Sequence, residues 1–280
     1  MARSVHSHEA ATSFAYSLEA MTFDPTISVL LGVAGLGIGT LSSLLGVGGG
    51  IFIVPLLTLS GLVGPMQEAT GTSNAVIVFT SLSATIAYAR RRAIDVRIGL
   101  SLMPMSVLGA WAGARLTSVI DSRWLAIGFA VILLYPIVMM LRGKTTSDVH
   151  ESGKGQMKGP EAYAIGATIG LVAGLASGLL GIGSGTIMVP SLALFLGLDI
   201  RTAVATSLFV MIPASVTSAV TQYTQGNLHI DLALPLIAGT VIGAQLGPFL
   251  GERIPRRRLR QLFGLLLLYA AVNMILKALR

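Results

Sequence analysis

The chain has 280 residues, of which 53% are hydrophobic and 11% are charged, and its formal net charge is +7. Soluble domains carry about 25% charged residues, so this composition argues against a soluble globular protein. The chain contains no cysteine, which excludes disulfides, thiolate catalysis and cysteine metal sites. The basic residues lie in short loops beside apolar runs, where they act as topology signals, and we expect no nucleic-acid partner.

Apolar runs dominate the chain from end to end. They span residues 27–59, 75–89, 98–116, 124–141, 162–196, 203–220, 232–250 and 262–279. Most of them approach the roughly 20 residues with which a helix crosses a bilayer. The sequence therefore predicts an all-α, multi-pass integral membrane protein with eight to ten transmembrane segments, in the cytoplasmic (inner) membrane of a bacterium. Residues 1–26 lack the basic start and apolar core of a signal peptide, so they predict a polar N-terminal tail.

A glycine-rich phrase that ends in proline occurs twice, and its matching glycines, Gly46 and Gly181, lie 135 residues apart. The two copies read Gly46-Val-Gly48-Gly49-Gly50 followed by Val54-Pro55, and Gly181-Ile-Gly183-Ser184-Gly185 followed by Val189-Pro190. Thr-Ser pairs at Thr72 and Thr206 also match. We therefore predict two homologous membrane repeats, residues 27–142 and 161–280, joined by a hydrophilic linker at 143–160.

The loop charges suggest that the two repeats insert in opposite orientations. Residues 90–97 carry four arginines, whereas the matching loop, residues 225–231, carries no Lys or Arg. One loop later the pattern is reversed, because residues 253–260 carry five arginines and the matching loop has Arg115 and Arg123. Since positive loops stay in the cytoplasm, matching loops of opposite charge favour inverted repeats.

Inversion requires an odd number of crossings in each repeat. If each glycine phrase turns the chain back, residues 27–45 and 51–64 become separate segments, and each repeat has five. Residues 51–64 would span only about 21 Å as a helix, so we expect a half-helix or re-entrant piece. The alternative is a kink within one helix, which leaves four helices per repeat and makes the repeats parallel.

At these phrases the chain resembles the TauE/SafE family of sulfite and organosulfonate exporters, also called the toluene-sulfonate uptake permease family. The resemblance rests on residues 44–50 and 179–185, the two Val-Pro pairs and the two Thr-Ser pairs, and it covers about residues 27–279. It implies a secondary transporter that exports sulfite or an organosulfonate by alternating access. The chain departs from a strict repeat at Ser184, where the first half has Gly49.

The glycine phrases themselves suggest an anion site. Irregular backbone at membrane depth occurs only inside protein or beside water, and glycine lets a ligand approach the main chain. A helix that starts near Gly50 or Gly185 would point its free N–H groups and positive dipole end at the glycines. Such a site binds an anion without a charged side chain. The competing interpretation is close packing of helices on small residues.

Polar residues near the phrases complete the predicted site. Hydroxyl groups can donate to the oxygens of an anion, although Ser and Thr often bond to their own helix carbonyls. Asn74 is more telling, because an amide inside a membrane needs several partners. The predicted substrate-binding residues are Gly46, Gly48, Gly49, Gly50, Thr72, Ser73, Asn74, Gly181, Gly183, Ser184, Gly185, Thr206 and Ser207.

The titratable residues lie away from the middle of the apolar runs. We interpret Glu68 as interfacial, the four histidines as solvated, and Asp95 and Asp231 as helix N-caps. No carboxylate or histidine is evident within the membrane, and no spacing suggests a metal site or a cofactor.

The sequence as a whole predicts a carrier of a small anion that is not an enzyme, with the lipid bilayer as its other partner and a homodimer possible. An anion channel and a transporter of the same fold with an unrelated small anion are the alternatives. A membrane enzyme would need a catalytic set, which we do not find, and a structural scaffold would not need two repeated breaks. The substrate, direction, coupling ion and oligomeric state do not follow from the sequence.

Overall fold

The computed structural model describes residues 24–141 and 160–250, together with residues 268, 271 and 272. Most of the predicted N-terminal tail, nearly all of the linker, the arginine-rich loop at residues 253–260 and most of the last apolar run lie outside the described residues. The described residues form helices and no strand, which confirms the all-α prediction.

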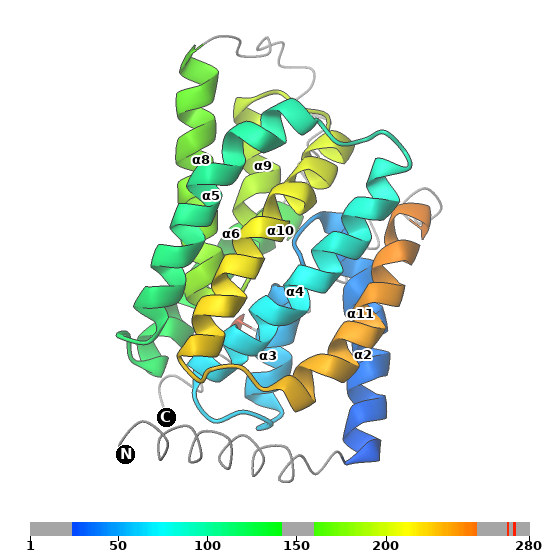
Figure 1. The fold of residues 1–280 in the computed structure, drawn as a ribbon, viewed down its shortest axis with the longest axis vertical. Coiled ribbons are helices and arrows are strands. Elements are labelled where there is room, and N and C mark those ends of the chain that lie inside the picture. The colour runs from blue at the N-terminus through cyan, green and yellow to red at the C-terminus, as the bar shows by residue number, and fades with distance from the viewer. Residues whose placement is uncertain (1–23, 142–159, 251–267, 269–270, 273–280) are drawn as a thin grey trace, which may run out of the picture.

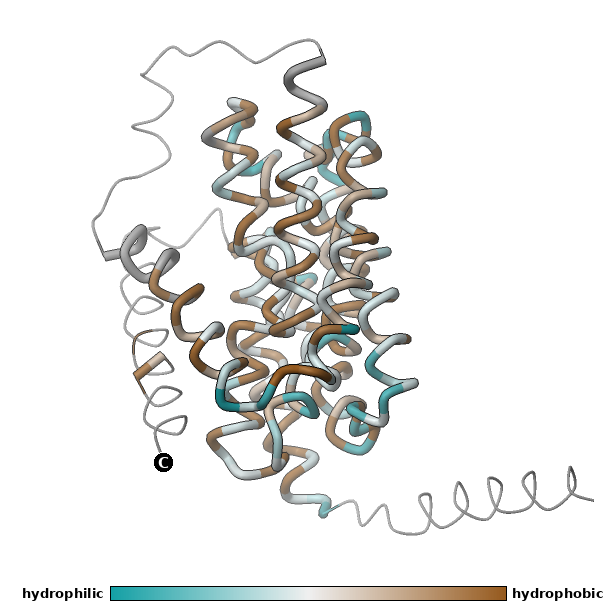
Figure 2. Tube along the Cα trace, turned by 90° about the vertical axis from the view of Figure 1, so that its left-hand side faces the viewer, coloured by the Kyte–Doolittle hydropathy of each residue, from teal (hydrophilic) through white to brown (hydrophobic). Residues whose placement is uncertain are grey.

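Short connections separate the helices within each half of the chain up to residue 250. In chain order they are α2 (Pro25–Leu45), α3 (Gly50–Leu59), α4 (Met66–Ala89), α5 (Val96–Thr117), α6 (Ser122–Leu141), α8 (Pro160–Leu180), α9 (Gly185–Phe195), α10 (Ile200–Thr224) and α11 (Ile230–Leu250). Within the described part, α2, α4, α5, α10 and α11 are long and apolar enough to cross a membrane. Residues in the hydrophilic colours of Figure 2 gather near the two ends of the bundle, as expected for a multi-pass membrane protein.

Both glycine phrases break the helix, as predicted. Gly46, Gly48 and Gly49 have φ angles of 73°, 79° and 96°, and Gly181 and Gly183 have 66° and 83°. These left-handed φ angles carry little strain only in glycine. Each glycine phrase therefore ends one helix and starts another. The helices that follow, α3 and α9, have 10 and 11 residues. At about 1.5 Å per residue each spans roughly half of a 30 Å hydrocarbon core.

The chain turns back at each break. In Figure 1, α2 begins and α3 ends at the lower end of the bundle, whereas α8 begins and α9 ends at its upper end. The α4–α5 connection lies at the upper end and the α10–α11 connection at the lower end. The glycine phrases are therefore turns, not kinks, and the two halves start at opposite ends of the bundle. How the halves face across a bilayer stays a prediction.

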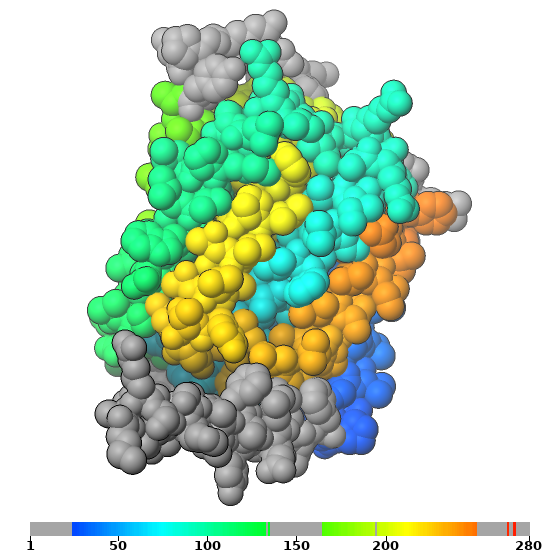
Figure 3. Space-filling view, viewed as in Figure 1, coloured from blue at the N-terminus to red at the C-terminus, as the bar shows by residue number. Residues whose placement is uncertain are grey.

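Helices of each half pack against helices of the other half. α2 of the first half packs along α11 of the second, and α8 of the second half packs along α5 of the first. α4 and α10 pack against each other between these two pairs. Figure 3 shows α5, α10, α4 and α11 side by side across one face. These helices carry large exposed apolar side chains such as Trp111 on α5 and Val220 on α10, which suits contact with lipid acyl chains.

Glycines set the close approach of the outer pairs. A Cβ atom at Gly39 of α2 would overlap the carbonyl oxygen of Thr240 on α11, and one at Gly243 would overlap that of Leu36. The α5–α8 pair repeats the arrangement, because a Cβ at Gly109 would overlap a carbonyl oxygen of α8. Small residues thus let these helix backbones come into contact. This is common in membranes, where the hydrophobic effect does not drive helices together and close packing does.

We predict that Gly39→Ala lowers the stability of the folded protein by about 1–3 kcal/mol, because the added methyl group has no space. Gly37→Ala is the matched control, since Gly37 is on the same helix and a Cβ there meets nothing within 4 Å. Thermal melting in detergent, followed by size-exclusion chromatography, measures both. Equal melting temperatures for the two variants would contradict the packing argument.

We also predict that the α4–α5 connection faces the cytoplasm and the α10–α11 connection the outside. The chain has no cysteine, so single cysteines report topology directly. Val96→Cys and Thr224→Cys place thiols at exposed positions beside the two connections. A membrane-impermeant maleimide added to intact cells should label Thr224→Cys alone. Labelling of both variants from one side would exclude inverted repeats.

Candidate functional site

The two glycine breaks lie against each other in the centre of the bundle. A Cβ atom at Gly50 would overlap the carbonyl oxygen of Gly181, and a Cβ at Gly185 would overlap that of Gly46. Residues 48–50 and 181–186 are buried. The start of each half-helix is therefore placed on the break of the other half. All thirteen residues predicted for the site are buried, and the glycines among them form its centre.

The serines of the Thr-Ser pairs hold the breaks together. Ser73 on α4 donates its hydroxyl hydrogen to the carbonyl oxygen of Gly181 at 2.8 Å. Ser207 on α10 lies 3.2 Å from the carbonyl oxygen of Gly46 and 2.9 Å from that of Val204. Each serine thus reaches the break of the opposite half. Ser73 thereby satisfies a main-chain carbonyl that the broken helix leaves without a partner, and Ser207 shares its proton between such a carbonyl and one in its own helix.

The threonines of the same pairs face the helix connections. The hydroxyl oxygen of Thr72 accepts the main-chain N–H of His229 at 3.1 Å, and that of Thr206 accepts the N–H of Asp95 at 3.0 Å. Both acceptors are fully buried. These threonines therefore anchor the turns that lead into α11 and α5. Substituting them would disturb those turns as well as any ligand contact.

Main-chain N–H groups at the breaks have no partner in the described part of the chain. In the first break these are the N–H groups of residues 48–51. In the second break they are those of residues 182–185. The first donors to find partners are further along each half-helix, at Phe52 and Thr186. Two sets of free N–H groups at positive helix ends therefore meet in one buried region.

Asn74 is the most unusual side chain of the site. It is fully buried, and neither its amide nitrogen nor its carbonyl oxygen has a hydrogen-bond partner among the described residues. Helical spacing places it on the α4 face that carries Thr70 and Ile77, which contact the breaks at Gly181 and Gly48. A buried, unpaired amide costs about 1–3 kcal/mol, so its retention suggests a bound partner.

Ser184 adds a second unpaired group on the other break. Its hydroxyl is buried and has no partner among the described residues. It is the residue before Gly185, the first residue of α9. The departure from a strict glycine repeat therefore places a polar hydroxyl where the first half has Gly49.

Met211 was not predicted, although it touches both breaks. Its sulfur would overlap a Cβ at Gly48 and would lie 3.5 Å from one at Gly183. Ile77, at the matching position of α4, would lie 3.2 Å from the Gly48 Cβ. A lone methionine in an apolar run carries no signal of such a role, because most such residues fill core gaps. In this structure these side chains close the region between the breaks.

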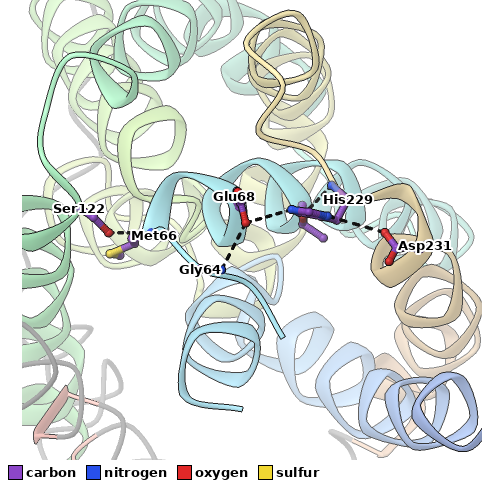
Figure 4. Close-up of polar contacts among 7 residues, drawn as sticks. Gly64, Met66, Glu68, Ser122, His229 and Asp231 are labelled. Carbon is purple, nitrogen blue, oxygen red and sulfur yellow. Dashed lines mark hydrogen bonds and ion pairs between the residues drawn. The ribbon is translucent and has the colours of Figure 1, made fainter. Parts of the chain in front are cut away.

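A titratable cluster lies at the lower end of the bundle, where the sequence indicated solvated groups. His229, in the α10–α11 connection, places Nε2 3.0 Å from Glu68 Oε2 and Nδ1 3.9 Å from Asp231 Oδ1. Figure 4 shows the imidazole between the two carboxylates. The Glu68 contact has ion-pair distance but lacks the alignment of a hydrogen bond. Glu68 and His229 are 161 residues apart in the chain, so no local pattern could join them.

The N-cap prediction is right for Asp95 and wrong for Asp231. Asp95 accepts the N–H of Ile98 at 3.0 Å and caps α5. Asp231 lies inside the first turn of α11, and His229 occupies the position before the helix. The carboxylate of Asp231 faces the imidazole instead. Among the described residues, no group of three His, Cys, Asp or Glu side chains is suited to a metal ion.

We predict that Gly48→Leu abolishes transport while the protein still inserts into the membrane. The side chain would collide with Met211 in the closed region, and the φ of 79° would be strained. Gly61→Leu is the control, because Gly61 has a φ of 73° but open space around a Cβ. Flux of radiolabelled sulfite in membrane vesicles, normalised to expression, measures the effect. Normal transport by Gly48→Leu would show that the breaks serve packing alone.

Comparison with known proteins adds an independent line of evidence. The family model described as "Sulfite exporter TauE/SafE" matches residues 31–274. A probable membrane transporter protein, YunE, of Bacillus subtilis (strain 168) is 32% identical over 265 residues, covering 88% of this chain and 97% of the relative. A second from the same strain, YdhB, is 31% identical over 242 residues, covering 83% and 96%. One from Xylella fastidiosa (strain Temecula1) is 26% identical over 253 residues, covering 89% and 95%. No solved structure gives a significant match.

Proposed function

This chain belongs to the TauE/SafE sulfite exporter family of membrane transporters, and we propose that it moves sulfite or an organosulfonate out of the cytoplasm by alternating access. The observation that carries the proposal is the buried junction of the two breaks. There, two sets of unpartnered main-chain N–H groups meet, and the unpaired amide of Asn74 is on the α4 face that contacts the breaks.

Neutral donors suit a small oxyanion. Sulfite and sulfonate groups present three oxygens that each accept hydrogen bonds, and helix starts bind such anions through N–H groups and the helix dipole. Charge-assisted hydrogen bonds contribute about 1.5–3 kcal/mol each, so a few donors are enough for specific binding. No Lys or Arg is among the thirteen predicted residues. An anion held this way can leave the site again, which a carrier requires.

Access to the junction must come from movement between the halves. The junction is buried, and Met211 and Ile77 pack against it. Ser73 and Ser207 connect each half to the break of the other half. Separation of the halves at one end would expose the junction to that side while the contacts at the other end hold. This is the movement expected of a carrier built from two repeats.

We predict that Asn74→Leu weakens the binding of sulfite roughly tenfold to a hundredfold and leaves the fold intact. Leucine is the residue of the second half at the matching position, Leu208, so the repeat itself shows that α10 accommodates it. The loss corresponds to one hydrogen bond to a charged ligand. Calorimetric titration of purified protein with sulfite, and then with an alkylsulfonate, measures the affinity.

Ser106→Ala is the matched control. Its hydroxyl is also buried and unpaired, but it lies on α5 beside Gly174 of α8, away from the breaks. It should bind sulfite like the wild type. If Asn74→Leu binds sulfite with wild-type affinity, the Asn74 amide is not part of the binding site.

A transport rate that grows linearly with the sulfite concentration, without saturation, would favour an anion channel over a carrier.

A further inference from the structure

The Glu68–His229 contact joins the two halves of the protein. Glu68 lies in the first turn of α4 in the first half, and His229 precedes α11 in the second half. The same carboxylate oxygen that faces the imidazole also accepts the main-chain N–H of Gly64 at 3.3 Å. In Figure 4 the glutamate is held from one side by the α3–α4 connection and meets the histidine on the other.

His229 is also connected to the predicted anion site. Its main-chain N–H donates to Thr72, which is four residues after Glu68 on the same face of α4. Thr72 is followed by Ser73, which holds the second break, and by Asn74. A displacement of the histidine therefore acts on α4 next to the residues that face the ligand.

In the described residues, the other end of the bundle has no equivalent pair. Thr206 accepts the N–H of Asp95 as Thr72 accepts that of His229, so Asp95 is the structural counterpart of the histidine. The residue that matches Glu68 is Thr202, which carries no charge at ordinary pH. The two ends thus share the main-chain contact, but within the described part of the chain the acid–histidine pair is found at the His229 end alone.

The side chains around His229 are partly exposed to solvent. Its side chain is 38% exposed, and those of Glu68 and Asp231 are 27% and 40% exposed, so protons in water reach all three. In the described part of the chain, the charged groups that contact the imidazole are Glu68 from α4 and Asp231 from α11. Histidine is the side chain whose charge ordinarily changes between about pH 5 and 8. Both carboxylates attract a protonated imidazole, and this attraction is absent when the imidazole is neutral.

We propose that Glu68 and His229 form a proton-binding site that couples anion transport to proton movement by closing this end of the protein when the proton is bound. The proposal rests on the alternating-access function proposed above. With the proton on the imidazole, the ion pair holds the start of α4 to the α10–α11 connection. Loss of the proton weakens this contact between the halves, and the end opens toward the anion site.

The opening of this end can be measured without any ligand. Spin labels on Gly64→Cys and Thr224→Cys, in a chain with no native cysteine, report the distance between the two halves in lipid nanodiscs. Between about pH 5.5 and pH 8.5, we expect the ratio of long-distance to short-distance populations to rise about twofold to fivefold, the range for a partly exposed ion pair. An unchanged ratio would overturn the proposal.

Two substitutions test whether this pair is the proton site. His229→Gln and Glu68→Gln keep hydrogen-bonding groups but remove the titratable charge, and each should abolish the pH dependence of the distance. Asp121→Asn is the control, because Asp121 is a carboxylate in the connection before α6 that makes no ion pair among the described residues. It should titrate like the wild type. A wild-type pH response in both glutamine variants would overturn the proposal.

Coupling is tested separately from substrate identity. Proteoliposomes containing a trapped pH dye are given a gradient of sulfite or of methanesulfonate, which carries no titratable proton. Coupling would be supported if anion flux through the wild type changes the dye signal and anion flux through His229→Gln does not. Flux without proton movement in the wild type would overturn the coupling but leave the proposed function standing. No flux of either anion, with the pH-dependent distance intact, would overturn the substrate assignment alone.

Discussion

The structure depends on one constraint: a main-chain polar group cannot be left facing lipid. A break in a transmembrane helix frees carbonyl and N–H groups, so it must lie inside protein. Here α4 and α10 pack against each other in the middle of the bundle, and their serines satisfy the freed carbonyls of Gly181 and Gly46. The carbonyls of Gly181 and Gly46 have protein partners, whereas the N–H groups at the starts of α3 and α9 have none among the described residues. This polarity suits the proposed anion site.

The two repeats form the common framework of the protein. Positions at which the two repeats differ are where we expect functional residues. Contacts repeat between the halves: Ser73 and Ser207 bond to opposite breaks, and Thr72 and Thr206 hold opposite turns. The polar groups without partners do not repeat. Asn74 faces the site where the second half has Leu208, and a hydroxyl at Ser184 replaces Gly49. A symmetric packing function would not require an unpaired amide on one side only.

Much of the fold follows from residue pattern, because glycine and apolar length act locally. The two breaks, the short helices after them and the multi-pass helical architecture were predicted, since positive φ favours glycine and a bilayer requires long apolar helices. Roles that depend on tertiary neighbours were not. The serines were predicted as ligand donors, but Ser73 donates to a carbonyl 108 residues away, and Ser207 shares its proton between the carbonyls of Val204 and Gly46. Glu68 and His229 each looked like a solvated boundary group, because their pairing exists only once α4 meets the α10–α11 connection.

The proposed carrier must bind its anion and also release it, and the placement of charge among the described residues suits both needs. A buried arginine would bind an oxyanion strongly but would leave an unpaired buried charge whenever the site is empty, at a cost of several kcal/mol. Main-chain N–H groups and one amide avoid that cost, since a neutral donor without a partner is far less unfavourable. The proposed proton site lies instead at the end of the bundle, at His229 beside Glu68, where both side chains are partly exposed. Separating a neutral binding site from a titratable contact between the halves lets affinity and opening be set by different residues.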